Sequence, residues 1–243
     1  MKHLSAIVAA LSIALTPAMA KAAEKTEVSL PISANLAAST TFVDRYITGS
    51  GFIPYDGPSV QPSLTTTVNH ANFGSVFANY WGNCSVDGTG NEQDITTAYT
   101  TPPLDLGTAG AATTSLGYFG GRSYGAGLGE GNITLALANV VNPAITIARD
   151  FNDGSGTYGG VSISPSLQLD EVASLSLTEA LRFNDRYFVN SSGISGLRTD
   201  LALNLRAGNT TLSMGGRHHL ALNPGFKDGF AFTTTLAYSH DLF

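Results

Sequence analysis

The fold is decided by a stretch near the end of the chain in which apolar and polar side chains alternate: Leu197-Arg198-Thr199-Asp200-Leu201-Ala202-Leu203-Asn204-Leu205-Arg206. Successive side chains of a β-strand point to opposite faces, so the leucines share one face and the charged residues share the other. The same alternation recurs in about a dozen segments, and no segment has the periodicity of a helix that could cover the apolar face. An uncovered apolar face predicts an all-β fold, a transmembrane antiparallel up-and-down β-barrel with apolar residues outside and polar residues within.

The chain begins with the features of a secretory signal peptide, which we expect to span residues 1–20. A basic start and an apolar run over residues 4–15 precede the cleavage-site pattern Ala18-Met19-Ala20. The run is shorter than the ~20 residues that a membrane-spanning helix needs, so a transmembrane anchor is the weaker interpretation. We therefore expect a short periplasmic segment over residues 21–31 and a barrel over residues 32–243 in the outer membrane of a Gram-negative bacterium.

The composition supports a barrel and argues against several other classes of protein. Charged residues make up 12% of the sequence, so most of its polarity comes from neutral hydroxyl and amide groups, which suit a barrel wall and lumen. The net charge of −6 and the lack of basic stripes argue against a nucleic-acid partner. Because Cys84 is the sole cysteine, no disulfide within the chain is possible, and we expect no cofactor.

The alternation, bounded by Gly, Pro, Asn and Asp, predicts about 12 strands. Pro62 and Pro165 each fall inside a predicted strand, where we expect a bulge or a strand end, because proline cannot donate to the ladder. Glu179 falls on an apolar face, which is costly at mid-membrane unless it lies near a rim or a bulge shifts the register. The predicted strands cover residues 32–46, 58–70, 74–83, 93–101, 110–119, 131–141, 143–150, 158–170, 172–184, 197–207, 209–220 and 229–242.

The predicted connections alternate in length, as they do in outer-membrane barrels, which have short periplasmic turns and longer external loops. Counted from the N-terminus, the odd-numbered connections are long and the even-numbered ones are short, except the long even-numbered connection over residues 102–109. The alternation places both chain ends in the periplasm, and the terminal aromatic Phe243 is of the kind that barrel-assembly machinery reads. The odd connections cover residues 47–57, 84–92, 120–130, 151–157, 185–196 and 221–228, and the short even ones lie at 71–73, 142, 171 and 208.

One part of the sequence resembles a known family. The unit Thr41-Phe42-Val43-Asp44-Arg45-Tyr46-Ile47-Thr48-Gly49 is followed, after a loop, by Pro58-Ser59-Val60-Gln61-Pro62-Ser63-Leu64. This arrangement resembles the start of the TorF-type porins of proteobacteria, and residues 77–83 and 94–99 are similar to the third and fourth strands of that family. The resemblance covers the first half of the mature chain. It implies an outer-membrane barrel for passive transport, with undefined substrates.

Charged residues on the polar faces of the predicted strands are the candidates for lining a pore. A passage lined by one sign of charge repels ions of that sign, so these mainly basic residues would favour anions. The alternative is that they pair with Asp170, Asp200 or loop acids and only brace the interior. The candidates are Arg45, Arg182, Arg198, Asp200, Arg206, Arg217 and His219.

Other motifs give weaker indications of chemistry. The glycine-rich residues 125–131 lack the strand-to-helix context of a nucleotide site and predict an external loop. Residues 150–156 resemble the start of a calcium loop but lack the bidentate Glu, so we expect no metal. His218 and His219 point to opposite faces, and Ser213 shares the face of His219 at an offset of roughly 20 Å, too far for proton transfer. We therefore expect no catalytic site.

Together these features predict an outer-membrane pore for passive diffusion of small polar solutes, not an enzyme. Its expected partners are outer-membrane lipid, lipopolysaccharide, the barrel-assembly machinery and the solutes themselves. The main alternative is a structural or adhesive barrel with a closed lumen and external loops that bind a partner. An outer-membrane lipid hydrolase and a soluble exported β-sandwich are weaker alternatives.

Overall fold

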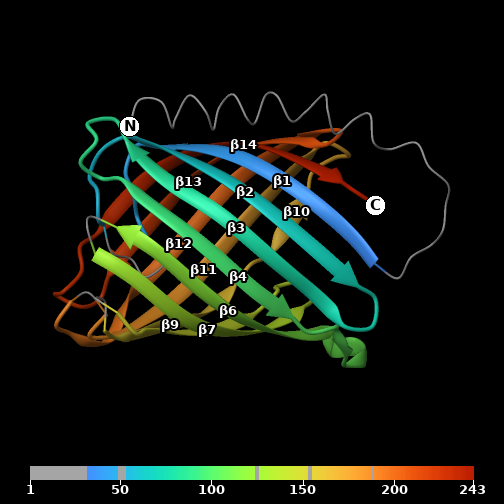
Figure 1. Ribbon diagram of the computed structural model, residues 1–243, viewed down its shortest axis with the longest axis horizontal. Helices are drawn as coiled ribbons and strands as arrows, with labels where there is room; N and C mark the ends of the chain where they lie inside the picture. Colours follow the sequence, from blue (N-terminus) through green and yellow to red (C-terminus); the bar gives the residue numbers. More distant parts are fainter. Residues whose placement is uncertain (1–31, 49–52, 124–125, 153–154, 188) are drawn as a thin grey trace.

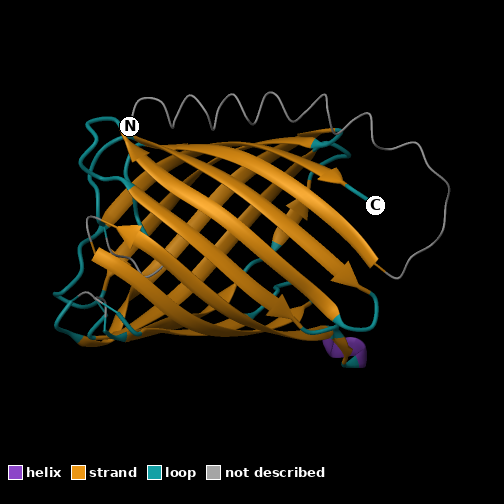
Figure 2. Cartoon of the chain, in the orientation of Figure 1, coloured by secondary structure: helices purple, strands orange, loops and turns teal. Residues whose placement is uncertain are grey.

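A computed structural model describes residues 32–48, 53–123, 126–152, 155–187 and 189–243. The predicted signal peptide and periplasmic segment, residues 1–31, lie outside these ranges. Within them, the chain forms a closed, all-antiparallel barrel of 12 long strands, as expected (Figures 1 and 2). No helix in the described part of the chain is long and apolar enough to cross a membrane.

Consecutive long strands pair with each other, and the last strand pairs with the first to close the ring. The short strands β5 (Leu104–Asp105) and β10 (Ser166–Gln168) flank β6 and β11, and a single 3-10 turn, η1, covers Gly107–Ala109 among the described residues. The ring consists of β1 (Ile32–Val43), β2 (Ser59–His70), β3 (Gly74–Ser85), β4 (Glu92–Thr100), β6 (Ala111–Ser123), β7 (Ala126–Ala138), β8 (Ala144–Asp150), β9 (Thr157–Ile163), β11 (Ala173–Asp185), β12 (Ser192–Ala207), β13 (Thr210–Ala221) and β14 (Gly229–Asp241).

The barrel is apolar outside and polar inside. Large apolar side chains of the wall are exposed on its outer surface, among them Ile95 at 59% and Phe232 at 62%. The inner face carries hydroxyl ladders between neighbouring strands, such as Thr41 with Thr235 at 2.8 Å. A soluble protein would bury the large apolar side chains and expose the hydroxyl groups, so this distribution is that of a membrane-spanning barrel.

The glycine-rich segment does not form the predicted loop over residues 120–130. Strands β6 and β7 extend through it and leave only residues 124–125 between them. Its glycines are strand residues because larger neighbours occupy the space beside them: the Asp94 carboxylate lies against Gly121, and the Tyr118 ring lies against Gly120. Cross-strand packing of this kind compensates for the weak strand preference of glycine.

The remaining connections follow the predicted alternation. Long loops at one end cover residues 44–58, 86–91, 151–156, 186–191 and 222–228, and the opposite end has turns at 71–73, 139–143, 169–172 and 208–209. The exceptional connection, residues 101–110, carries β5 and η1. The end with the long loops is extracellular, because barrels of this type have short periplasmic turns. Pro165 separates β9 from β10, so the strand predicted over residues 158–170 is divided, as its proline suggested.

Candidate functional site

A basic cluster lines the lumen on three neighbouring strands. Arg182 of β11, Arg198 of β12 and Arg217 of β13 all face inward, together with Asp200 of β12. Asp200 bridges two of the arginines: its Oδ2 lies 3.0 Å from Arg198 Nε, and its Oδ1 lies 2.6 Å from Arg217 Nε. Three arginines against one aspartate leave this side of the lumen positively charged.

Arg217 also holds an extracellular loop inside the barrel. Its guanidinium donates a hydrogen bond of 2.8 Å to the backbone carbonyl of Ile47, in the loop between β1 and β2. Ile47 is only 2% exposed, and the side chains of Ile47 and Ile53 lie against Gly229 of β14. Part of the loop over residues 44–58 therefore packs against the inner wall and narrows the lumen.

Arg182 differs from the other two arginines. Within the described ranges its side chain forms no hydrogen bond or ion pair, and its Nε is buried without a partner. The side chain lies against Gly160 of β9, where any larger residue would displace it. Arg182 is therefore a lumen cation that is not directly paired with a carboxylate of the described residues.

An acidic cluster, which the sequence analysis did not identify, lines another part of the lumen. Its members are buried inward residues of three strands: Glu92 and Asp94 of β4, Glu130 of β7 and Asp150 of β8. Tyr158 of β9 donates a hydrogen bond of 2.8 Å to Glu130 Oε1. Counting around the ring, β4 and β12 are six strands apart in either direction, so Asp94 and Arg198 belong to opposite sides of the barrel.

Tyr187 extends from the loop after β11 toward the acidic cluster. Its ring packs on that of Tyr158, with ring centroids 4.4 Å apart. Burial, followed by the nearby charges of Glu130 and Asp150, raises the pKa of the Tyr187 hydroxyl above its ordinary value. The hydroxyl therefore remains protonated, as a hydrogen-bond donor close to the carboxylates.

The structure brings together five of the seven predicted pore-lining residues. Arg182, Arg198, Asp200 and Arg217 are joined by His219, which is fully buried; its ring lies against Gly196, and both ring nitrogens lack a partner in the described part of the chain. The other two predicted residues lie away from this cluster. Arg45 follows β1 and pairs with Asp56 in the same loop. Arg206 lies near the periplasmic end of β12 and donates a hydrogen bond of 3.1 Å to the Gly208 carbonyl.

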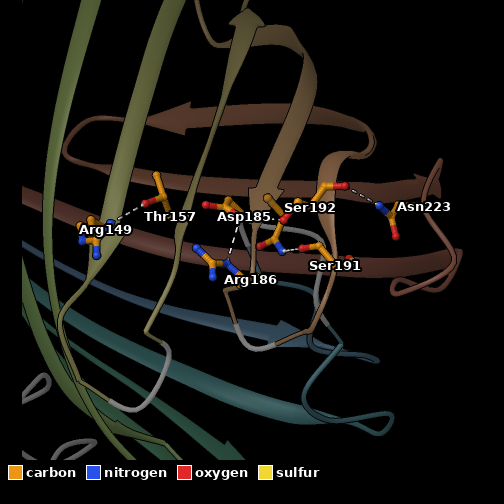
Figure 3. A network of polar contacts seen from close by, with 8 residues as sticks. Arg149, Thr157, Asp185, Arg186, Ser191, Ser192 and Asn223 are labelled. Carbon is orange, nitrogen blue, oxygen red and sulfur yellow. Dashed lines mark hydrogen bonds and ion pairs between the residues drawn. The ribbon is translucent and has the colours of Figure 1, made fainter.

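Polar contacts tie the extracellular ends of the strands together around the mouth of the barrel (Figure 3). Asp185, at the end of β11, accepts a hydrogen bond from Ser192 at 2.6 Å and pairs with Arg186 at 3.3 Å. Asn223 of the next loop donates to the Ser192 carbonyl at 3.4 Å. These contacts hold the loops between β11 and β14 close to the strands that carry the basic cluster.

In the described residues, the other motifs of the sequence do not bring their candidate groups together. Ser213 donates to Asn204 Oδ1 at 2.7 Å instead of approaching His219. Across the described residues, no group of His, Cys, Asp or Glu side chains could hold a metal ion. The start of the calcium-like segment, Asp150, is a buried lumen residue of β8, and part of that segment lies outside the described ranges.

Comparison with known proteins gives matches in structure only. No protein-family model and no curated protein matches the sequence. The KdgM porin superposes with a TM-score of 0.53 at 8% identity, over 85% of this chain and 99% of that one. The NanC porin gives 0.54 at 10% identity, over 84% of this chain and 98% of that one. At such identities the likeness establishes the fold, and this chain has the barrel fold of outer-membrane porins.

Proposed function

We propose that the protein is an outer-membrane pore for the passive diffusion of small polar solutes. The observation that carries this proposal is the lumen, whose basic cluster on β11–β13 and acidic side chains on β4–β8 give a closed ring a polar, charged interior. A barrel that only braced the membrane would have no need to place so many ionisable groups inside. The shared fold with the KdgM and NanC porins supports the proposal.

The acidic cluster changes the expected ion selectivity. The sequence analysis predicted a lumen lined mainly by basic residues, which would favour anions. Four carboxylates instead face inward from β4, β7 and β8, opposite or beside the arginines. Positive and negative groups on different sides of a lumen create a field across it, so we propose that the pore orients dipolar and zwitterionic solutes instead of strongly favouring anions.

Liposome swelling tests the proposal directly. Vesicles containing the refolded protein should swell in iso-osmotic solutions of small neutral sugars at a rate that falls steeply with sugar size. Arg217→Gln, which removes the hydrogen bond to the Ile47 carbonyl, should admit larger sugars because the β1–β2 loop is released. Vesicles that never swell, with either protein, would contradict a pore.

A structural or adhesive barrel with a closed lumen is the second candidate function. It is favoured by one observation, the burial of Ile47 and Phe226 inside the extracellular end of the barrel. In that case the external loops would bind a partner and the lumen would carry nothing. If vesicles with Arg217→Gln swelled and vesicles with the wild-type protein did not, the result would support this second candidate.

The remaining assignments rest on the sequence and the fold together. We propose export through cleavage after residue 20, membership of the TorF-type porin family, and assembly by the barrel-assembly machinery into a membrane that contains lipopolysaccharide. We propose no catalytic role. Release of a mature chain that begins near Lys21, detected by mass spectrometry of the outer-membrane fraction, would support the first of these assignments.

A further inference from the structure

A fully buried histidine lies beneath an extracellular loop at one side of the mouth. His219, near the extracellular end of β13, is 0% exposed. Its ring fills the space beside Gly196 of β12, and the ring of Phe226 lies 6.3 Å away, centroid to centroid. Phe226 belongs to the loop over residues 222–228 and is itself only 8% exposed. The loop therefore folds into the mouth and covers the imidazole.

The covered ring suits a neutral imidazole and not a charged one. In the described residues neither ring nitrogen of His219 has a hydrogen-bond partner. A neutral imidazole has one donor and one acceptor, whereas an imidazolium has two donors and a full positive charge, which is far more costly to bury without a partner. A histidine ring that is surrounded by water takes up this proton near pH 6.5.

The charged groups around His219 add to the cost of a positive charge on its ring. In the strand register it pairs with Arg198 of β12, and Arg182 of β11 also lies within range of its charge. Its register partner on β14 is a glycine, and His218, the neighbouring titratable residue of β13, points to the outer wall. The loop brings one carboxylate into range, that of Asp228. Two arginines against one aspartate oppose a further positive charge at this position.

The Asp228 carboxylate is bonded to the backbone and not to the imidazole. Its Oδ1 accepts a hydrogen bond of 2.7 Å from the N–H of Ala221, the last residue of β13. In the docked loop this carboxylate does not reach either ring nitrogen of His219. A charged ring therefore finds its hydrogen-bond acceptors only when the loop moves and water enters.

The loop is the element that can move at the lowest cost. Its ties to the strands are isolated hydrogen bonds: the Leu222 N–H donates to the Ser195 carbonyl at 3.0 Å, and Asn223 donates to the Ser192 carbonyl at 3.4 Å (Figure 3). The strands β12, β13 and β14 are instead joined by continuous ladders. A charge that the covered site cannot accommodate should therefore displace the loop and leave the wall intact.

We propose that protonation of His219 releases the loop over residues 222–228 from the mouth, so that this loop is an acid-sensitive gate. With a neutral ring the loop is docked and Phe226 covers His219. A released loop exposes the ring to water, where it binds the proton more tightly, so the docked form is lost as the pH falls through about 6.5 and below. The movement depends on the fold alone, whereas the change in conductance that follows from it rests on the proposed pore function.

The mobility of a spin label on the loop tests the movement directly. A nitroxide is attached to Lys227→Cys, an exposed loop position, in the full-length mature protein with the exposed Cys84 replaced by Ser, and the protein is refolded into lipid vesicles. The ratio of mobile to immobile label should rise about tenfold or more between pH 7.5 and pH 5, because the buried, unpaired charge favours the released loop. In planar bilayers the unit conductance should rise over the same range.

The two adjacent histidines provide a matched control. His219→Gln cannot titrate and keeps a polar side chain, so the label should no longer respond to pH. His219→Phe keeps a ring in the buried site and should give the same result, which guards against a failure of the first variant to fold. His218→Gln removes a histidine from the outer face of the same strand and should respond as the wild type does.

Two results would overturn the proposal. One is a label whose mobility is the same at pH 7.5 and pH 5 in the otherwise wild-type protein. The other is a response that persists in both His219→Gln and His219→Phe, which would assign the movement to another group. A label that is released at pH 5 only when His219 is present, with no current at any pH, would support the gate and refute the proposed pore instead.

Discussion

Replacing Asp200 by Asn should make the pore more selective for anions. In the structure this carboxylate pairs with both Arg198 and Arg217, at 3.0 and 2.6 Å. The change removes one negative charge and leaves both arginines in place. Because Asn is nearly isosteric with Asp and the Asp200 side chain is partly exposed, at 26%, the strand should keep its register.

The size of the effect follows from Coulomb's law. For an ion passing at about 8 Å, one unit charge in water contributes about 0.5 kcal/mol, and that distance is within the Debye length at ~0.15 M salt. An anion gains this energy and a cation loses it, so the free energies differ by about 1 kcal/mol and the anion-to-cation permeability ratio should rise about fivefold. A lower effective dielectric constant in the lumen would enlarge the change.

The assay is the reversal potential of the channel in a salt gradient, for wild type and Asp200→Asn. Asp56→Asn serves as a control, because Asp56 lies in an exposed part of the β1–β2 loop, with 70% of its side chain accessible. The control should shift the potential little. A reversal potential unchanged by Asp200→Asn, with unit conductance intact, would show that the basic cluster is remote from the path of the ions.

Three further predictions concern the wall and the loops. Leu203→Arg should cost about 2–4 kcal/mol of folding free energy in vesicles if Leu203 lies near the membrane midplane, whereas Ala202→Ser on the inner face should cost little; equal costs would refute the assignment of the faces. Arg217→Gln should raise single-channel conductance by releasing the β1–β2 loop, and an unchanged conductance would show that the loop does not obstruct the lumen. Hydrogen bonds from the backbone and side chain of Thr89 lower the pKa of Asp87. The turn that these bonds form should therefore persist at pH values below the ordinary aspartate pKa and be lost as the pH falls through the lowered pKa. An NMR titration of the Thr89 amide with a midpoint at or above the ordinary aspartate pKa would contradict this.

The alternation of side chains was enough to predict the barrel, because a period of two residues fixes which face each strand presents. In the structure Arg182, Arg198, Asp200 and Arg217 lie on the inner face and Leu201 on the outer one. This information is local, since it depends on the residues of one strand at a time. The same logic could have identified Asp94, which is in phase with the polar face of its own strand.

Features that depend on contacts between strands could not be predicted in this way. The sequence predicts a loop where β6 and β7 form strands, because the side chain that compensates for Gly121 belongs to Asp94 on β4. Ser195 is an extra residue in β12, where the register with β11 shifts, and its position appears only once the two strands are aligned. The sequence showed Glu179 on an apolar face but not its partner Thr199, which lies 20 residues further along the chain.

Single-channel recording of the purified, full-length mature protein in planar bilayers is the most direct test of the central claim that the polar lumen conducts. We expect discrete, ohmic conductance steps, with larger steps for Arg217→Gln than for wild type. Silence of both proteins at high protein load, while electrophoresis shows that both are folded, would contradict it.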